Sequence, residues 1–466
     1  MYENNLIKSI FAPQNMQNML LSELYALYNQ HPAIVTDSRK CLSNSIFFAL
    51  KGEAFDGNTF AKNTLQSGCA YAVIDNASYL TDKRMILVDD VLSTLQQLAC
   101  LHRKSFGVPV IGITGTNGKT TTKELTAAVL SKKYNVLFTQ GNLNNHIGVP
   151  LTLLRLTSEH EIAIIEMGAN HHGEIRSLAN IAQPDYGLIT NVGYAHLEGF
   201  GSIEGVISTK GELYDFLRKS GGKVFINNDD SHLTRIAEGI EQITYGMASG
   251  TNNLVSGRVI NCNPFLSFEW QQRHNHLWHT VDTNLVGDYN IYNALAAISI
   301  GINFNITPEL INNAIADYAP ENNRSQLKKT AYNTIILDSY NANPSSMRAA
   351  LNNFTSSGVI PETATHSSNP DSSPAPLPKA IILGDMLELG NKSAELHDDI
   401  VKLIEKSGIR KVLLCGEQFS ATGKSFSCFP SVVNLIEFLK KEPLQGYNIL
   451  IKGSHGMHLE RIIDFL

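Results

Sequence analysis

The segment "VIGITGTNGKTTTKEL", residues 110–125, carries the residue types that bind phosphate. Its glycines and threonines follow an apolar run, precede a helical segment and end in the tripeptide Gly-Lys-Thr at 118–120. Such a turn aims backbone N–H groups and a lysine ammonium at phosphate oxygens. The usual loop has glycine where this chain has Ile113, and glycines stand at Gly112 and Gly115 instead, so the loop is a variant.

This chemistry assigns a role to each polar residue of the loop. Lys119 is expected to contact the β and γ phosphates of a nucleotide, and the Thr120 hydroxyl is expected to bind Mg²⁺. The other nucleotide contacts of the loop are predicted at Gly115, Thr116, Asn117, Gly118 and Thr121. The alternative is a plain glycine turn between a strand and a helix. The apolar strand before the tripeptide and the helix after it favour phosphate binding.

A second apolar run, "EIAIIE" at 161–166, ends in Glu166. In phosphate-loop enzymes an acidic residue at such a strand end binds the metal, although aspartate is usual there. Glu166 is therefore predicted to bind Mg²⁺, and the alternative is a solvated carboxylate.

Two further candidates lie in "NVGYAHLEGFGSIEGVISTKGELYDFL", residues 191–217. His196 is expected to follow a strand end directly, and Lys210 is expected to begin a helix that carries Leu213 and Leu217. A lone histidine is more often structural and a lone lysine is usually solvated. By themselves these two residues do not predict a function.

The elements around these residues indicate an α/β protein of three units. In residues 1–90, strand-like runs at 45–50, 71–75 and 85–90 lie among turns. In residues 91–319, helices are predicted at 91–105 and 289–302, an extended meander at 255–287, and strands at 108–113, 134–138, 161–166, 186–190 and 223–226. In residues 320–466, strands are predicted at 333–338, 379–385, 410–415 and 448–453. Strands that alternate with helices predict parallel sheets with ligands at the carboxyl ends of the strands.

Composition narrows the class of protein. With 466 residues, 43% hydrophobic and 17% charged, the chain is expected to form several globular domains. A net charge of −6 gives no basic excess for nucleic acid. No apolar run approaches the ~20 residues of a membrane span, and the N-terminus has no apolar segment typical of a secretory signal. Residues 355–378, rich in serine, proline and threonine, are expected to form a mobile surface loop.

The cysteines indicate in which cellular compartment the protein is expected. The six residues, at positions 41, 69, 100, 262, 415 and 428, form no CxxC pair. Neither a zinc site nor a disulfide framework is indicated, and a reducing, cytoplasmic location is expected.

Together the motifs resemble the Mur ligases, ATP-dependent amide-forming enzymes that build the peptide stem of the bacterial cell wall. The resemblance rests on "TGTNGKTTT", on the strand that ends in Glu166, on "NVGYAHLEGFGS" and on the following Lys210, and it covers nearly the whole chain. It implies that residues 1–90 bind the UDP end of the substrate, that a central phosphate-loop domain at 91–319 binds ATP, and that a Rossmann-like domain at 320–466 closes over the site about a hinge near 320.

The same resemblance implies two Mg²⁺ sites. Carbamylation of Lys210 by CO₂ would turn a repelling ammonium into an anionic ligand with two hard oxygens for the second ion. His196 would approach that ion.

Four stretches resemble the family member that joins D-alanyl-D-alanine to UDP-MurNAc-tripeptide through an acyl phosphate. They are "GNLNNHIGVPLTLL" (141–154), "NRSQ" (323–326), "DSYNANPSSM" (338–347) and "LGDMLELG" (383–390). The "DNPR" stretch typical of the diaminopimelate- or lysine-adding sister is absent, and His146 stands where many members have aspartate. The alternatives are another Mur-type amino-acid ligase, a folylpolyglutamate synthase, which has no N-terminal UDP domain, and a non-catalytic nucleotide switch.

The remaining site residues come from this resemblance. Asn293 matches a residue at the adenine side of ATP, and Arg324 and Asp338 match residues that contact the γ-phosphate and the ribose. Tyr340 and Asn341 lie beside Asp338, near the nucleotide. Substrate contacts are predicted at Ser38, Arg39, Lys51, Gly52, Asn142, Asn144, Asn145 and Lys452; for Lys452 the alternative is a solvated lysine. Lys119, His196, Lys210 and Arg324 are predicted to be catalytic, and a monomer that inserts into no membrane is expected.

Overall fold

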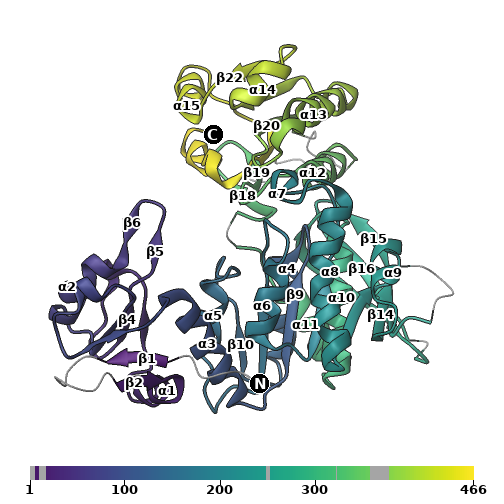
Figure 1. The fold of residues 1–466 in the computed structure, drawn as a ribbon. Helices are drawn as coiled ribbons and strands as arrows, with labels where there is room; N and C mark the ends of the chain where they lie inside the picture. The colour runs from purple at the N-terminus through teal and green to yellow at the C-terminus, as the bar shows by residue number, and fades with distance from the viewer. Residues whose placement is uncertain (1–5, 10–16, 248–251, 276, 322, 357–376) are drawn as a thin grey trace.

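The computed structural model describes residues 6–9, 17–247, 252–275, 277–321, 323–356 and 377–466. Three larger sheets follow one another along this part of the chain, and helices cover each of them (Figure 1). The predicted α/β class is confirmed. The domain boundaries at 90 and 319 stay a prediction.

The first sheet has the strand order β2-β1-β8-β7-β4-β3. Strands β3, β4, β7 and β8 run parallel, and β1 is antiparallel to both of its neighbours. Its strands are β1 (Leu6–Ser9), β2 (Gln17–Leu20), β3 (Ile34–Val35), β4 (Ile46–Phe48), β7 (Tyr71–Ile74) and β8 (Met85–Leu87). Helix α1 (Leu21–Gln30) packs on one face and α2 (Ala61–Gln66) on the other. A hairpin of β5 (Lys51–Gly52) and β6 (Phe55–Asp56) projects from this unit (Figure 1).

The central sheet has nine strands in the order β10-β11-β9-β12-β13-β14-β15-β16-β17. Strands β9 to β14 are parallel, as the alternation with helices predicts, and β15, β16 and β17 form the predicted antiparallel meander. The strands are β9 (Val110–Thr114), β10 (Val136–Phe138), β11 (Ile162–Glu166), β12 (Tyr186–Ile189), β13 (Lys223–Asn227), β14 (Glu241–Gly246), β15 (Val255–Cys262), β16 (Phe265–Gln272) and β17 (His279–Val286).

Helices cover both faces of the central sheet, because its strands are apolar on both sides. On one face lie α4 (Lys119–Leu130), α10 (Asn290–Asn303) and α11 (Pro308–Asp317). On the other lie α3 (Val91–Lys104), α5 (Gly148–Leu153), α6 (Glu174–Ala182), α8 (Ile203–Ser220) and α9 (Ser231–Ile236). Helix α3 packs on α1 as well as on α5 and α6, so one apolar core continues from the first unit into the central one.

Two local predictions are wrong. Lys210 does not begin a helix but lies in the middle of α8, because the Ser202 hydroxyl accepts a hydrogen bond from Gly205 N at 3.2 Å and starts the helix earlier. His196 does not follow a strand end directly. Strand β12 ends at Ile189, and the loop that follows continues to His196, just before α7 (Leu197–Phe200).

The third sheet has the order β18-β19-β23-β20-β21-β22, with only β18 antiparallel among these described strands. The strands are β18 (Gln326–Lys329), β19 (Thr334–Asp338), β20 (Lys379–Gly384), β21 (Lys411–Cys415), β22 (Ser427–Phe429) and β23 (Asn448–Lys452). One face packs on α12 (Pro344–Ser356), α13 (Ser393–Ser407) and α14 (Glu417–Thr422), and the other on α15 (Val432–Lys441) and the 3₁₀ helix Leu459–Phe465. The predicted loop at 355–378 begins inside α12, and its residues 357–376 lie outside the described residues.

Two general expectations can be compared with the fold. Within the described ranges, no helix combines the length and the apolar character that crossing a membrane requires. All six cysteines carry free thiols. The cytoplasmic location stays a prediction.

Candidate active site

A cavity of about 1230 Å³ lies where the carboxyl ends of the central strands face the third unit. Its walls bring together most of the predicted site residues, although they are far apart in the sequence. Those that line it are Thr116, Asn117, Gly118, Lys119, Thr120, Thr121, Asn142, Asn144, Asn145, Glu166, His196, Asn293, Arg324, Asp338, Tyr340, Asn341 and Lys452. Gly115, Lys210, Ser38, Arg39, Lys51 and Gly52 are not part of this lining.

The phosphate loop joins β9 to α4 through two glycines with positive φ, Gly115 at +143° and Gly118 at +78°. A Cβ atom on Gly115 would lie 2.0 Å from Thr190 Oγ1, and one on Gly118 would lie 2.5 Å from Asn293 Oδ1. Only glycine allows both the conformation and the close approach. Asn293 supports the loop from behind, since its Oδ1 accepts a hydrogen bond from Thr122 Oγ1 at 3.0 Å.

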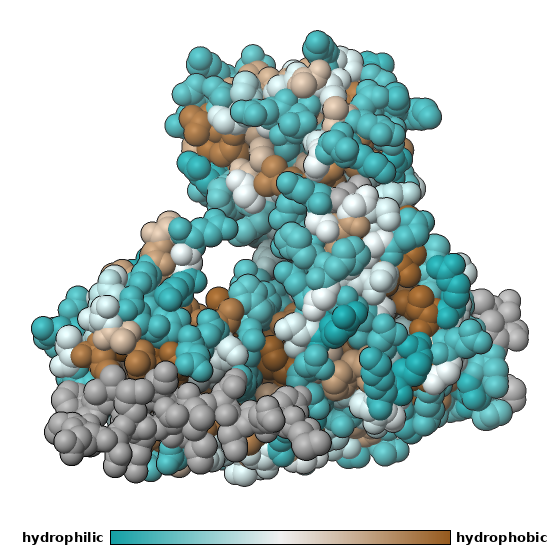
Figure 2. Space-filling view, viewed as in Figure 1, coloured by the Kyte–Doolittle hydropathy of each residue, from teal (hydrophilic) through white to brown (hydrophobic). Residues whose placement is uncertain are grey.

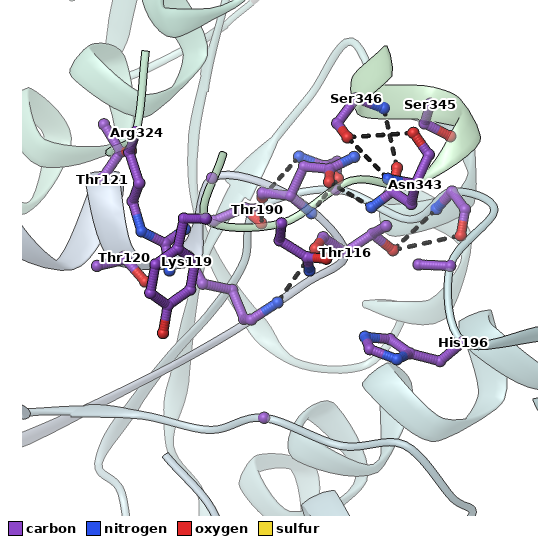
Figure 3. A pocket seen from close by; sticks show the side chains of 18 of the residues that line it. Thr116, Lys119, Thr120, Thr121, Thr190, His196, Arg324, Asn343, Ser345 and Ser346 are labelled. Carbon is purple, nitrogen blue, oxygen red and sulfur yellow. Dashed lines mark hydrogen bonds between the residues drawn. The ribbon is translucent and has the colours of Figure 1, made fainter. Parts of the chain in front are cut away.

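Lys119 is the first residue of α4, and its ammonium turns back over the loop. Its Nζ donates hydrogen bonds to Gly115 O at 2.7 Å and Thr116 O at 3.1 Å. Burial lowers the pKa of Lys119 to about 8, Glu166 opposes this shift, and the nearby charge of Arg324 adds to it. Figure 3 shows Lys119 and Arg324 in the same part of the cavity. Two cationic side chains line the same part of the cavity, which is a favourable place for an anion.

Glu166 ends β11 beside the first turn of α4 and is 1% exposed. Its two oxygens accept hydrogen bonds from Thr120 Oγ1 at 3.0 Å and Asn144 Nδ2 at 2.8 Å, and Lys123 Nζ lies 3.9 Å from Oε2. A hydroxyl and a carboxylate are hard oxygen donors, and they fit one Mg²⁺. In the part of the chain that the structure describes, no group of three or more His, Cys, Asp or Glu side chains surrounds a metal-sized site. An ion held by Thr120 and Glu166 would therefore complete its shell with water and phosphate oxygens.

Lys210 points from α8 into the protein and is 2% exposed. Its Nζ donates to Ala169 O at 3.4 Å and lies 5.3 Å from the centre of the Phe200 ring. Burial, with help from the charge of Lys119, holds the pKa of Lys210 well below its ordinary value. The neutral amine that this favours is the form that can react with CO₂.

His196 has a left-handed backbone with φ +49° and lines the cavity. Its Nδ1 contacts the carboxylate of Glu388, a residue of the third unit that also has positive φ. This contact lowers the pKa of Glu388. The edge of the imidazole faces Phe200, with ring centres 6.1 Å apart, so His196 and Lys210 share one aromatic neighbour.

The third unit contributes a cationic and an anionic group. The Arg324 guanidinium lies 3.7 Å from the centre of the Tyr340 ring, a cation–π contact that holds it flat. Asp338, at the end of β19, accepts hydrogen bonds from Ser325 N at 3.2 Å and from Lys452 Nζ at 2.5 Å. Lys452 is 1% exposed, so it is not a solvated lysine, and its charge is paired with Asp338.

The residues predicted for the UDP end lie in the first unit. Ser38 and Arg39 belong to a 3₁₀ turn, where Arg39 pairs with Asp37 at 2.8 Å. Lys51 and Gly52 form β5, and Lys51 Nζ lies 2.8 Å from an Asp75 oxygen. In the space-filling view an open gap lies between the first unit and the rest of the molecule (Figure 2).

Sequence reasoning missed four residues at the site. Lys123 has a fully buried Nζ beside Glu166, and Glu388 contacts His196. Asn343 and Ser345, at the start of α12, bond to the phosphate loop and to the loop after β12. The Asn-Pro dipeptide at 343–344 is a helix-start signal that could have indicated the first of these two.

The fold and the loop define the class, a phosphate-loop α/β protein in which a third unit faces the loop. The Mur ligase family, catalytic domain, matches residues 32–113, and the Mur ligase middle domain matches residues 113–301. A UDP-N-acetylmuramoyl-tripeptide–D-alanyl-D-alanine ligase of Bacillus subtilis (strain 168) is 35% identical over 93% of this chain and 92% of that protein. The protein of the same name in Escherichia coli (strain K12) is 33% identical, with 93% of each chain covered.

A solved structure supports the same family. A crystal structure of MurF from Acinetobacter baumannii superposes with a TM-score of 0.81, is 29% identical, and covers 93% of this chain and 92% of that one. The chain belongs to the Mur ligase family. It is an enzyme, an ATP-dependent ligase.

Proposed function

We propose that this chain joins D-alanyl-D-alanine to UDP-N-acetylmuramoyl-tripeptide at the expense of ATP and gives the UDP-MurNAc-pentapeptide of peptidoglycan synthesis. The observation that carries the proposal is the cavity that is lined by Lys119 and Glu166 of the central unit and by Arg324 of the third unit. Relatives that carry this activity in their names are 31–35% identical over most of the chain.

In this proposal each of the three units has a different role in substrate binding. Residues 1–90 hold the UDP end through Ser38, Arg39, Lys51 and Gly52, residues 91–319 bind ATP, and residues 320–466 close the cavity. The gap in Figure 2 leaves room for a long substrate that reaches from the first unit to the phosphate loop. Asn142, Asn144 and Asn145, on the cavity wall, then lie where its peptide end arrives.

The first step brings two anions together. The terminal carboxylate of the tripeptide attacks the γ-phosphorus of ATP, the bond from that phosphorus to the β,γ-bridging oxygen breaks, and ADP leaves with that oxygen. The product is an acyl phosphate. Lys119 and Arg324 offset the repulsion between carboxylate and triphosphate and stabilise charge on the transferred group.

The residues present fit the implied metal ions. Thr120 and Glu166 would hold one Mg²⁺ through oxygen, and His196 with a carbamylated Lys210 would hold a second. When bound, Mg²⁺ neutralises phosphate oxygens and polarises the transferred group. Burial of the Lys210 amine supports its reaction with CO₂, in which Nζ bonds to carbon and loses protons to solvent.

In the second step the amine of D-alanyl-D-alanine attacks the acyl carbonyl, the carbon–oxygen bond to phosphate breaks, and the amine proton is lost to phosphate or solvent. In this mechanism, positioning of the amine contributes most of the acceleration of the second step. Because the acyl phosphate is sensitive to water, the third unit must cover the cavity during both steps.

The alternatives differ in the acceptor. A sister Mur ligase would take a single amino acid. A folylpolyglutamate synthase would have no use for a first unit of its own, whereas the relatives above match this chain over 92–93% of its length. The named relatives are ligases, which disfavours a non-catalytic switch.

The test is phosphate release from ATP in the presence of Mg²⁺ and UDP-MurNAc-tripeptide, with D-alanyl-D-alanine or single amino acids as acceptors. We expect release that depends on the dipeptide. Release that responds only to a single amino acid would mean a sister ligase, and no release with any acceptor would contradict the proposal.

A further inference from the structure

Two hydrogen bonds connect the start of α12, in the third unit, to the phosphate-loop edge of the central unit. Asn343 Nδ2 donates to Asn117 Oδ1 at 2.8 Å, and Tyr194 N donates to Ser345 Oγ at 3.2 Å. Figure 3 shows Asn343, Ser345 and Ser346 gathered beside Thr116. The approach is close, since a Cβ atom on Gly193 would lie 2.9 Å from Ser345 Oγ.

Both ends of the Asn343 amide are in use. Its Oδ1 accepts a hydrogen bond from Ser346 N at 2.9 Å, and its own N–H donates to Ser346 Oγ at 3.1 Å, which together cap α12. The cap fixes the amide plane and leaves Nδ2 directed at Asn117. The side chain is 4% exposed, so water does not compete strongly for this donor.

The acceptor is held as firmly as the donor. Asn117 N donates to Asn191 Oδ1, and Asn117 O accepts from Asn191 Nδ2, both at 3.0 Å, while Thr190 Oγ1 also donates to Asn117 O at 2.6 Å. These bonds fix the main chain of the phosphate loop. The Asn117 side chain is then the part of the loop that is offered to the third unit.

The segment that contains Asn343 also carries Asp338 and Tyr340, and the Arg324 guanidinium lies on the Tyr340 ring. We propose that Asn343 is a positioning residue that docks the third unit on the phosphate loop in the register that sets Arg324 opposite Lys119. The docking stands on geometry alone, whereas its effect on turnover rests on the proposed function.

The test uses Asn343→Ser. Serine keeps the helix cap but has no amide to reach Asn117. The matched control is Asn76→Ser, because Asn76 Oδ1 caps a 3₁₀ turn of the first unit by accepting from Ser78 N at 3.0 Å, away from the cavity. We expect faster hydrogen exchange of the backbone amides of 115–121 in Asn343→Ser, with exchange in β21 and β22 unchanged. We also expect kcat to fall, by up to about 100-fold, because small misplacements of catalytic groups are costly.

A double-mutant cycle separates docking from a general structural effect. Asn117→Ala and Asn343→Ser remove the same bond, so the double variant is expected to show no more exchange and no lower kcat than the worse single variant. Additive effects, or loop exchange in Asn343→Ser equal to that in Asn76→Ser, would overturn the proposal. Should Asn343→Ser fail to fold, Ser345→Ala leaves the Asn343 cap intact and is expected to speed exchange at 193–194; unchanged exchange there would count against docking. If wild type makes no pentapeptide, the proposed function fails while the exchange comparison still decides the docking.

Discussion

Lys210 is a lysine of the site that is buried away from water. It is 2% exposed and has a single carbonyl and an aromatic ring as neighbours of its Nζ. A permanently charged ammonium is costly in such a place. Conversion to a carbamate that binds a metal would remove the buried ammonium and its free-energy cost. This conversion would explain why a lysine is buried at this position.

Replacement of Lys210 is therefore expected to abolish a modification as well as activity. In Lys210→Ala we expect kcat/KM to fall by about 100-fold or more, because the loss of a residue that holds or supports a metal ion typically has an effect of this size. After incubation with ¹³C-bicarbonate, a carbamate ¹³C NMR signal is expected in wild type and absent in the variant. Lys219→Ala, on the exposed end of the same helix, serves as the control. A signal that persists in Lys210→Ala would show that another amine carries it.

His397 is expected to make the stability of the protein depend on pH. The ring is fully buried, its Nε2 accepts from Met386 N at 3.0 Å, and its Nδ1 lies 2.7 Å from Ser393 O, to which it donates. Burial holds the pKa of His397 below its usual value. Between the folded-state pKa and about 6.5 the unfolded chain binds more protons, so stability is lost as pH falls through this range.

The measurement compares thermal unfolding of wild type and His397→Gln at pH 7.5 and 5.5. The variant is expected to be less stable at pH 7.5, because packing is lost, and to lose less on acidification than wild type does. An equal loss in both proteins would mean that His397 does not contribute to the pH dependence.

Among the elements, the phosphate loop is the most tightly constrained. Gly115 combines φ +143° with a Cβ position 2.0 Å from Thr190 Oγ1. Gly115→Ala is expected to cost about 1–3 kcal/mol in backbone strain alone and to abolish nucleotide binding, because Thr190 must move. Gly107→Ala is the matched control, since a Cβ there meets nothing within 4 Å. Isothermal titration with ATP and Mg²⁺ checks both variants, and full affinity in Gly115→Ala would contradict the loop geometry.

The sequence predicts helices and strands correctly where residues close to their ends mark those ends. The apolar strands that end at Thr114 and Glu166 were found because a polar residue ends each apolar run and a glycine follows within two positions. The start of α8 was missed because a single serine, Ser202, caps it, and the place of His196 was misjudged because a loop separates it from the end of β12. The Asn117–Asn343 bond joins residues that are 226 positions apart, and no periodicity or spacing encodes such a contact.

At the scale of the whole molecule, the contacts that join the three units differ in kind. A continuous apolar core around α3 unites the first and central units. At the cavity, the third unit meets the central one through polar contacts such as Asn343 with Asn117 and Glu388 with His196, and the apolar contact between these units includes Val286 of β17. Polar contacts of this kind separate more easily than an apolar core.

We therefore expect the third unit to rotate about the connection near residue 320. A nucleotide that contacts both Lys119 and Arg324, as proposed, should shift the protein to a closed form. Small-angle X-ray scattering is expected to show a smaller radius of gyration with a non-hydrolysable ATP analogue and Mg²⁺ than without them. An unchanged radius would count against the hinge.

The central claim is that ATP activates the tripeptide carboxylate for attack by D-alanyl-D-alanine. The most direct measurement uses UDP-MurNAc-tripeptide labelled with ¹⁸O in both oxygens of the terminal carboxylate, with mass spectrometry of the pentapeptide and of the released phosphate. We predict that each amide bond formed leaves one ¹⁸O in the pentapeptide and transfers one ¹⁸O to phosphate. Phosphate without ¹⁸O, or ATP hydrolysis without pentapeptide, would contradict the account.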